Sequence, residues 1–116
     1  MLPKEIIVFL NSDFRNAWVK LPYGELYLRN TNRYIEDKRR WTIDVANVTV
    51  KEKERGKGHF KQLIDDLEAG LGHRGVEVLY AENIHEPRLM PFFERRGYKI
   101  DPYTTENCFY KLLELK

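Results

Sequence analysis

Two glycines flanked by basic residues are the first candidates for chemistry in this sequence. Gly56 and Gly58 lie in the run 55–61, Arg-Gly-Lys-Gly-His-Phe-Lys, where an alternating β-branched segment ends and a 3.6-residue apolar period begins. At a strand-to-helix junction, glycine permits a sharp turn, and the free N–H groups of the helix favour an anion. The spacing predicts a phosphate-binding loop. An ordinary turn that needs two glycines is the alternative.

A carboxylate in the preceding segment is the second candidate. Asp44 lies between Ile43 and Val45 in the segment 41–50, which is predicted to be the central strand. Buried among apolar neighbours, its carboxyl is expected to have a raised pKa and to favour its neutral form. The alternative is a structural role, bonded to nearby backbone or paired with an arginine. Unless a bulge changes the phase, one face of this strand carries Thr42, Asp44, Ala46, Val48 and Val50.

The segment after the glycines is predicted to be an amphipathic helix that ends at Gly70 and Gly72. Its core-facing stripe is Phe60, Leu63, Ile64, Leu67 and Leu71. Residues 76–81 then form a short apolar strand. We expect it to run parallel to 41–50, because a strand, helix, strand sequence with short connections makes a right-handed crossover.

The rest of the chain is predicted to extend this sheet at both ends. Residues 5–10 are expected to be a first strand, and 17–21 pairs with 25–30 around the turn Pro22-Tyr23-Gly24. Residues 33–36 extend the sheet, and 37–40 form a charged turn. A second helix starts near Pro91 or has a kinked opening, and it stops at Gly97. Residues 98–101 and 108–115 form a closing hairpin.

Composition places the chain among soluble globular proteins. Its 116 residues suit one domain, 1–116, with 42% apolar and 33% charged residues, and a net charge of +2 does not by itself indicate nucleic acid. The apolar run 6–10 is too short for a signal peptide or a membrane span, so we expect a cytoplasmic protein. The single cysteine, Cys108, excludes an internal disulfide and is expected in the core, and no spacing indicates a metal site.

The segment Arg55-Gly56-Lys57-Gly58 resembles the acetyl-CoA pyrophosphate loop of the GNAT superfamily of N-acetyltransferases. That pattern is Arg or Gln, two residues, Gly, one residue, then Gly or Ala. Arg55 and Gly58 match it, whereas Phe60 stands where the family has a small residue. The resemblance covers roughly residues 24 to 115, including Val48-x-Val50, Asn83 after a second apolar strand, and the run 92–98 that ends in a Gly-aromatic pair.

This resemblance implies a fold and a co-substrate. The fold is α/β (α+β), with a mixed, mostly antiparallel twisted sheet, two main helices, and a central parallel pair splayed around acetyl-CoA. The pantetheine would add to the backbone of the central strand, as a ligand strand does. The implied cofactor-binding residues are Val48, Val50, Arg55, Gly56, Lys57, Gly58, His59, Phe60, Lys61, Asn83 and Phe93.

The resemblance also implies catalytic roles for direct attack of an amine on the acetyl thioester. Asp44 lies eleven residues before Arg55, the offset at which histone-acetylating members place a glutamate base. The backbone N–H of Val48 is the implied oxyanion donor. Phe93 occupies the position of the usual tyrosine acid, so the leaving thiolate would need water, His85, Tyr98 or no acid.

The acceptor is predicted to be a protein lysine or N-terminus. Only residues 11–21 separate the expected first strand from the Pro22 turn, too few for the two helices that usually enclose the acceptor, although a homodimer could supply a wall. No nucleic acid or membrane partner is expected. A non-catalytic acetyl-CoA-binding or protein-interaction module is one alternative. A nucleic-acid binder is another, whose basic residues interleave with Glu52 and Glu54: Lys51, Lys53, Arg55, Lys57 and Lys61.

Overall fold

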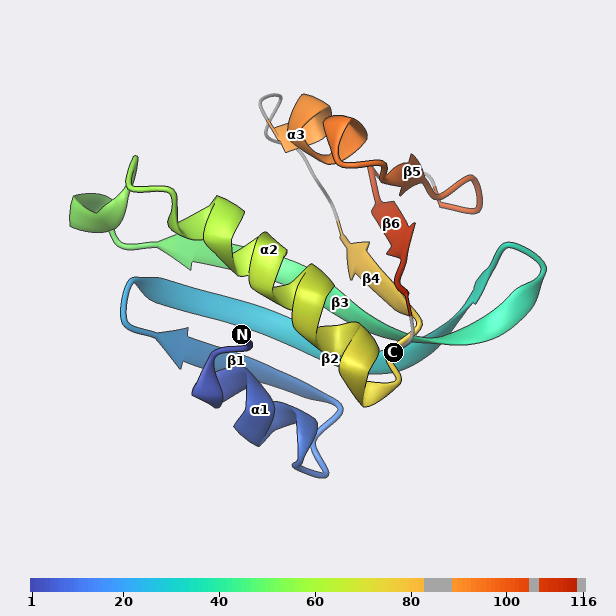
Figure 1. The fold of residues 1–116 in the computed structure, drawn as a ribbon, viewed down its shortest axis with the longest axis horizontal. Coiled ribbons are helices and arrows are strands. Elements are labelled where there is room, and N and C mark those ends of the chain that lie inside the picture. Colours follow the sequence, from blue (N-terminus) through green and yellow to red (C-terminus); the bar gives the residue numbers. More distant parts are fainter. Residues whose placement is uncertain (83–88, 105–106, 115–116) are drawn as a thin grey trace.

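The computed structural model describes residues 1–82, 89–104 and 107–114 of the chain. Its strands form a single six-stranded sheet in the order β1-β2-β3-β4-β6-β5 (Figure 1). Two short 3-10 turns follow β3 and α2, at Glu52–Glu54 and Gly72–Arg74. The main elements are α1 (Lys4–Leu10), β1 (Asn16–Leu21), β2 (Gly24–Ile35), β3 (Lys38–Val50), α2 (His59–Leu71), β4 (Val78–Ala81), α3 (Leu89–Arg95), β5 (Lys99–Ile100) and β6 (Phe109–Leu112).

Every neighbouring pair of strands is antiparallel except β3 and β4, which run parallel. The predicted hairpin around Pro22, the parallel crossover through α2 and the closing hairpin of β5 and β6 are all confirmed. Cys108 is buried beside β6, as predicted for a core residue. The predicted fold class, a mostly antiparallel mixed sheet with one central parallel pair, is therefore confirmed as well.

The prediction of a first strand at 5–10 is wrong, because this segment is the helix α1. Ile6 and Phe9 are buried three residues apart, whereas Val8 between them is 69% exposed. That spacing places one apolar stripe of a helix against the core. The Ile-Ile-Val-Phe run favours a strand by intrinsic propensity, but tertiary packing overrides such a preference in a short segment.

The predicted charged turn at 37–40 is also misplaced. Glu36 and Asp37 have positive φ values of 47° and 71°, and they alone connect β2 to β3. Two central residues with positive φ match the right-handed twist of a tight hairpin. Lys38, Arg39 and Arg40 are therefore strand residues, paired with Ile35, Tyr34 and Arg33. The hairpin is long, and its charged side chains lie along the strands.

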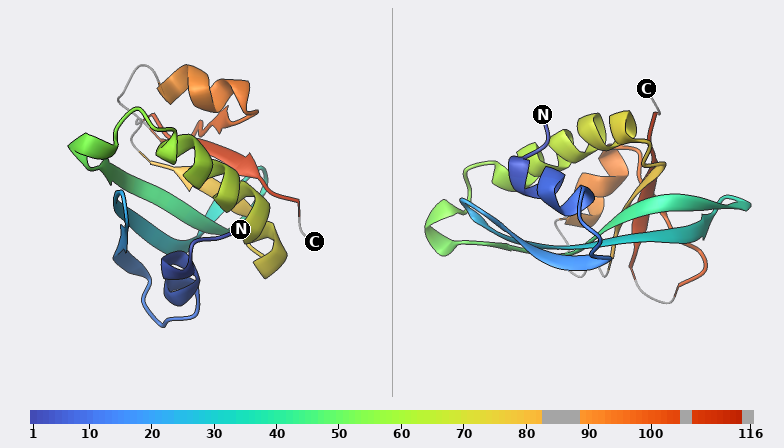
Figure 2. Two further views of the ribbon diagram at one scale, coloured as in Figure 1. Left: turned by 60° about the vertical axis from the view of Figure 1, so that its left-hand side comes forward. Right: turned by 90° about the horizontal axis from the view of Figure 1, so that it is seen from below.

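The core lies between the sheet and the helices, which all cover the same face of the sheet (Figure 2). Helix α2 contributes four buried side chains of its predicted stripe: Leu63, Ile64, Leu67 and Leu71. These pack against alternate residues of the sheet, including Leu26, Leu28, Ile43 and Val45. The opposite face of the sheet is left without a helix, and Asp44 lies on it. Among the described residues, no helix is long and apolar enough to cross a membrane.

Arg96, just after α3, holds the C-terminal part of the fold to α2. Its guanidinium contacts Asp65 and donates to Glu68 Oε1 at 2.9 Å, and Tyr98 donates its hydroxyl to Glu68 Oε2 at 2.7 Å. The hydrogen bond from Arg96 holds the pKa of Asp65 below its ordinary value. Folding therefore stabilises the charged carboxylate, and this contribution is present above the unfolded-state pKa and lost as the pH falls through the folded one.

We expect Arg96→Met to lower the free energy of unfolding at pH 7 by about 1–2 kcal/mol, the usual value of hydrogen bonds to charged groups. The difference from the parent should begin to narrow at about pH 4, the ordinary pKa of an aspartate, and should narrow further as the pH falls through the lowered pKa of Asp65 in the folded protein. Urea unfolding at pH 7 and pH 3 measures both quantities. Arg95→Met, at an exposed position of the same helix, is the matched control and should change little. A difference that stays constant across this pH range would contradict the assigned ion pair.

Candidate functional site

Strands β3 and β4 pair over only four residues and then separate. The parallel ladder runs from Thr42 with Val78 to Val45 with Ala81, and the N–H of Glu82 donates to the Val45 carbonyl at 3.0 Å. Beyond this bond, β3 continues to Val50, whereas β4 ends at Ala81 (Figure 1). Residues 46–50 of β3 consequently have an edge that is not paired with β4.

A bulge at Ala46 decides which groups face this edge. Val45 pairs with Leu28 and Asn47 pairs with Tyr27, so Ala46 is an extra residue in β3. Val45 directs its carbonyl toward β4 and packs its side chain into the helix-side core, and Val48 packs into the same core. Alternation along the strand therefore directs the backbone groups of Val48 and Val50 to the free edge.

The bulge also corrects the predicted set of residues on one face of β3. Before it, Thr42 and Asp44 point away from the helices. After it, Val48 and Val50 point toward them. The two predicted catalytic groups thus lie on the same strand, with the Asp44 carboxylate on the helix-free face and the Val48 N–H on the edge between the faces.

Among the residues that the structure describes, no side chain caps the N-terminus of α2. Gly58 is its N-cap residue with φ of 81°, and Gly56 has φ of 78°. A Cβ atom added to either glycine would meet nothing within 4 Å, so the loop has free space around it. The first N–H groups of a thirteen-residue helix lack partners within the helix, and its dipole favours an anion there.

The charged residues of this loop gather around that N-terminus. Arg55 donates from Nε to the Val50 carbonyl at 3.3 Å, which ties the loop to the end of β3. His59 Nε2 lies 3.0 Å from Glu54 Oε1, and its ring stacks on Tyr23 at 4.3 Å. The hydrogen bond with His59 keeps the pKa of Glu54 below its ordinary value. Lys57 also approaches Glu54, at 3.4 Å.

Of the predicted cofactor-binding residues, Phe60 and Phe93 belong to an aromatic cluster between α2 and α3. Phe93 is 1% exposed, with its ring edge-on to Phe60 at 6.1 Å and stacked near Phe109 at 5.9 Å. A buried ring offers no surface to a ligand, so we assign Phe93 to the core. Phe60 is half-buried, and its ring packs against those of Phe92 and Phe93.

Asp44 is fully buried, but its surroundings are not apolar. Its Oδ2 accepts hydrogen bonds from Arg33 Nε at 2.9 Å and Nη2 at 2.8 Å, and its Oδ1 accepts from the Thr42 hydroxyl at 2.8 Å. The guanidinium of Arg33 also lies 4.0 Å from the centre of the Tyr80 ring. Burial lowers the pKa of Arg33, but bonding to Asp44 outweighs it and the net shift is upward. This geometry favours the structural alternative for Asp44.

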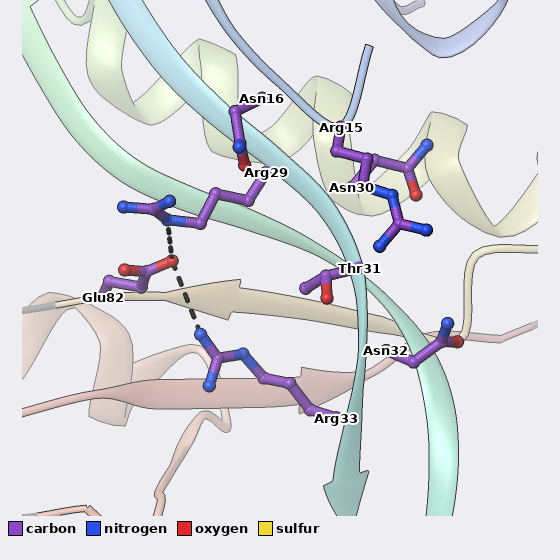
Figure 3. Close-up of a pocket in the computed structure, with 8 residues that line it drawn as sticks. All are labelled: Arg15, Asn16, Arg29, Asn30, Thr31, Asn32, Arg33 and Glu82. Carbon is purple, nitrogen blue, oxygen red and sulfur yellow. Dashed lines mark ion pairs between the residues drawn. The ribbon is translucent and has the colours of Figure 1, made fainter. Parts of the chain in front are cut away.

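Sequence reasoning missed the pocket on the helix-free face of the sheet. The pocket has a volume of about 500 Å³, and Figure 3 shows its polar lining. Glu82 Oε2 lies 3.0 Å from Arg29 Nε and 3.5 Å from Arg33 Nη2. The available signal was the alternation of Arg29, Thr31 and Arg33 on one strand face, together with a carboxylate at the end of β4. The lining residues are Arg15, Asn16, Arg29, Asn30, Thr31, Asn32, Arg33 and Glu82.

Burial raises the pKa of the Glu82 carboxyl, and hydrogen bonding and charge repulsion from Asp44 raise it further, against the lowering effect of Arg29 and Arg33. Glu82 is therefore the carboxylate at this site whose pKa moves toward the range of a general base. Two other residues singled out from the sequence, Asn83 and His85, lie outside the described residues.

Comparison with solved structures identifies the architecture. A mutant of the toxin AtaT, bound to the C-terminus of the antitoxin AtaR and acetyl-CoA, matches with a TM-score of 0.62 and 16% identity over 78% of this chain and 58% of that one. A GNAT-family acetyltransferase from Listeria monocytogenes matches with a TM-score of 0.64 and 16% identity over 82% of this chain and 59% of that one. This chain has the GNAT acetyltransferase fold.

The share of each chain that the similarity covers differs among the comparisons. AtaT complexed with acetyl-methionyl-tRNAfMet matches with a TM-score of 0.64 and 13% identity over 95% of this chain and 82% of that one. No family model and no curated protein matches the sequence. Against the mutant AtaT and the Listeria enzyme, the GNAT-like chain spans less than two thirds of the other protein's length.

The prediction of a protein acceptor with no nucleic-acid partner is wrong. Proteins with this fold include AtaT in complex with acetyl-methionyl-tRNAfMet and an AtaT–AtaR complex bound to DNA. The prediction rested on the shortness of residues 11–21 after an expected strand at 5–10. That segment is the helix α1, which packs against the sheet, so the argument from a missing wall does not hold.

Proposed function

We propose that this protein is an acetyl-CoA-dependent N-acetyltransferase. The observation that carries the proposal is the combination of an edge of β3 that β4 does not pair with and, in the loop after that strand, a helix N-terminus that no described side chain caps. The edge suits an extended amide-containing arm, which would add to β3 as a strand does. The N-terminus of α2 suits a pyrophosphate. The acetyl-CoA-bound complex of the AtaT mutant, which has the same fold, supports this assignment.

The residues proposed to hold acetyl-CoA follow from these two features. Val48 and Val50 would bind its amide-containing arm through their backbone groups, and the loop around Gly56 and Gly58 would bind its phosphates through backbone N–H groups and basic side chains. Arg55, Lys57, His59 and Lys61 supply positive or hydrogen-bonding side chains around the same helix N-terminus. Acetyl-CoA itself supplies an activated thioester for transfer.

Chemistry at the thioester needs a donor for the developing oxyanion and a group that takes the ammonium proton. The backbone N–H of Val48 is the proposed oxyanion donor, because it faces the edge where β3 and β4 separate. Asp44, predicted as the base, has both carboxylate oxygens engaged by Arg33 and Thr42. The base is therefore expected to be a nearby group whose acceptor atoms are not both engaged in this way.

A non-catalytic acetyl-CoA-binding module is the second candidate function. It is favoured by the buried Phe93, which carries no proton for the leaving thiolate at the position where the resemblance places a tyrosine. The two candidates differ in one measurable respect. A binding module would retain acetyl-CoA without releasing CoA in the presence of any amine.

The acceptor class is open to nucleic-acid-borne amines as well as small ones, because AtaT, with the same fold, is found with acetyl-methionyl-tRNAfMet. The test is incubation with acetyl-CoA and a panel of amino acids, polyamines and aminoacyl-tRNA. Free thiol is followed by absorbance and acetylated amine by mass spectrometry. The proposal predicts equal amounts of both products with at least one amine. Acetyl-CoA binding without release of thiol would favour the binding module, and failure to bind would exclude both.

A further inference from the structure

The side of the sheet from which an acceptor can approach is set by the core. On the helix side, the point where β3 and β4 part is closed by Val45 and Ala81, which are 5% and 2% exposed and pack under the helices. On the opposite side, Glu82 opens onto the 500 Å³ pocket described above. Glu82 also donates its backbone N–H to Val45 at that parting point. The pocket is therefore beside the proposed acetyl position on the accessible face.

Glu82 Oε2 has two arginine neighbours but no well-aligned hydrogen bond with any described residue. This oxygen is buried and accepts no directed hydrogen bond from the described residues, although Arg29 Nε lies 3.0 Å away. Arg33 donates two hydrogen bonds to Asp44, and its Nη2 lies 3.5 Å from Glu82 Oε2. A buried carboxylate oxygen without a directed partner is costly unless a donor satisfies it. A primary ammonium group supplies such donors.

The opposite end of the pocket is cationic. Arg15 is exposed, and within the described part of the chain its side chain has no hydrogen bond or ion pair. Arg29 is 40% exposed, with its guanidinium 5.2 Å from the centre of the Tyr27 ring. Arg33 and Asp44 neutralise each other, which leaves two arginines against Glu82. Guanidinium groups bind phosphate and carboxylate through paired hydrogen bonds.

We propose that this pocket is the acceptor site and takes a primary amine that carries a phosphate or carboxylate close to the amino group. Glu82 binds the ammonium and accepts its proton, and Arg15 and Arg29 bind the anionic group. The amine nitrogen then forms its bond to the acetyl carbon as the bond from that carbon to sulfur breaks, and the second proton that the nitrogen loses on becoming an amide neutralises the thiolate, which leaves as the free thiol of CoA. The volume suits one small group of this kind. The assignment rests on the proposed acetyltransferase function.

The test compares ethanolamine with O-phosphoethanolamine, which differ only by the phosphate. We expect kcat/KM to be about 10- to 100-fold higher for the phosphorylated amine, the range of hydrogen bonds to charged groups. Arg15→Gln and Arg29→Gln should each reduce this preference, measured as the ratio of the two kcat/KM values within the same variant. Arg39→Gln, at an exposed position of the β2–β3 hairpin, is the matched control and should retain the preference. Equal kcat/KM for the two amines would overturn the proposal.

Glu82→Gln tests the other end of the pocket. We expect kcat to fall about 100-fold for both amines, as for loss of a general base, with acetyl-CoA affinity retained. Unchanged kcat in a variant that is folded by circular dichroism would overturn the role of Glu82. The same turnover assay with aminoacyl-tRNA as the acceptor, and with deacylated tRNA as its control, distinguishes an anionic group on a small molecule from one on a nucleic acid.

A binding measurement separates failure of this inference from failure of the acetyltransferase proposal. In nuclear magnetic resonance spectra of the parent protein, O-phosphoethanolamine should shift the Nε–H signals of Arg15 and Arg29, and ethanolamine should not. These shifts need no turnover, so they are expected even if no acetyl group is transferred. Their absence would overturn the proposed site, whereas their presence without any acetylated product would count against the enzyme activity alone.

Discussion

Replacing Gly58 by glutamate is expected to abolish acetyl-CoA binding while the fold is retained. Gly58 is the N-cap of α2, where the free N–H groups and the helix dipole are proposed to hold the pyrophosphate. A carboxylate there would repel the phosphates and compete for the same donors. A side chain in the left-handed region costs about 1–2 kcal/mol, which a folded domain tolerates. Calorimetry with acetyl-CoA should show at least a 100-fold loss of affinity.

Gly97→Glu is the matched control for this variant. Gly97 has φ of 86°, close to the 81° of Gly58, and a Cβ there would also meet nothing within 4 Å. It follows α3 and is not part of the loop between β3 and α2. The two substitutions therefore impose similar backbone strain and the same charge, but only one does so at the proposed phosphate site. Equal affinity in the two variants would show that the phosphate site is misplaced.

Asp44→Asn is expected to destabilise the protein by about 3 kcal/mol, because it removes the carboxylate that accepts two hydrogen bonds from the half-buried Arg33 and leaves only Glu82, at 3.5 Å, as a counter-charge. This result would mark Asp44 as a structural partner. Urea unfolding measures the change, and Asp13→Asn, at an exposed position, is the control. A double-mutant cycle with Arg33→Met should give a coupling energy above about 1 kcal/mol.

The activity of Asp44→Asn distinguishes the two roles considered for this residue. A structural partner predicts that the folded variant still turns over amines, with the effect confined to stability and to the geometry of the neighbouring pocket. A general base predicts a large loss of kcat at neutral pH with unchanged stability. Loss of activity in a variant as stable as the parent would restore the prediction made from the sequence.

Sequence reasoning could predict the centre of the fold because there the local signals agree. The alternation in 41–50, the glycines at 56 and 58 and the apolar stripe from Leu63 to Leu71 all indicate a strand, a turn and a helix, and each is observed. The prediction of a strand at residues 5–10 failed because the local signals there are weak. The apolar run 6–10 has only five residues and little periodicity, and its contacts with the core decide between helix and strand.

The candidate site was only partly accessible to such reasoning. The proposed phosphate loop is contiguous in the sequence, so the sequence alone could nominate its residues. The Arg33 partner of Asp44 lies on the neighbouring strand, and its pairing follows from the β2–β3 register and the bulge at Ala46. Glu82 reaches the same pocket through the parallel pairing of β4. Such long-range contacts are set by strand register, which a single sequence specifies weakly.

Amide hydrogen exchange with and without acetyl-CoA tests the central claim most directly. The claim is that the ligand adds to the free edge of β3 and seats its phosphates at the N-terminus of α2. Saturating acetyl-CoA should slow exchange at Val48 and Val50 and at the amides of 56–60, with little change in the β1–β2 hairpin. Unchanged exchange at both places under saturating ligand, or protection confined to another part of the sheet, would contradict it.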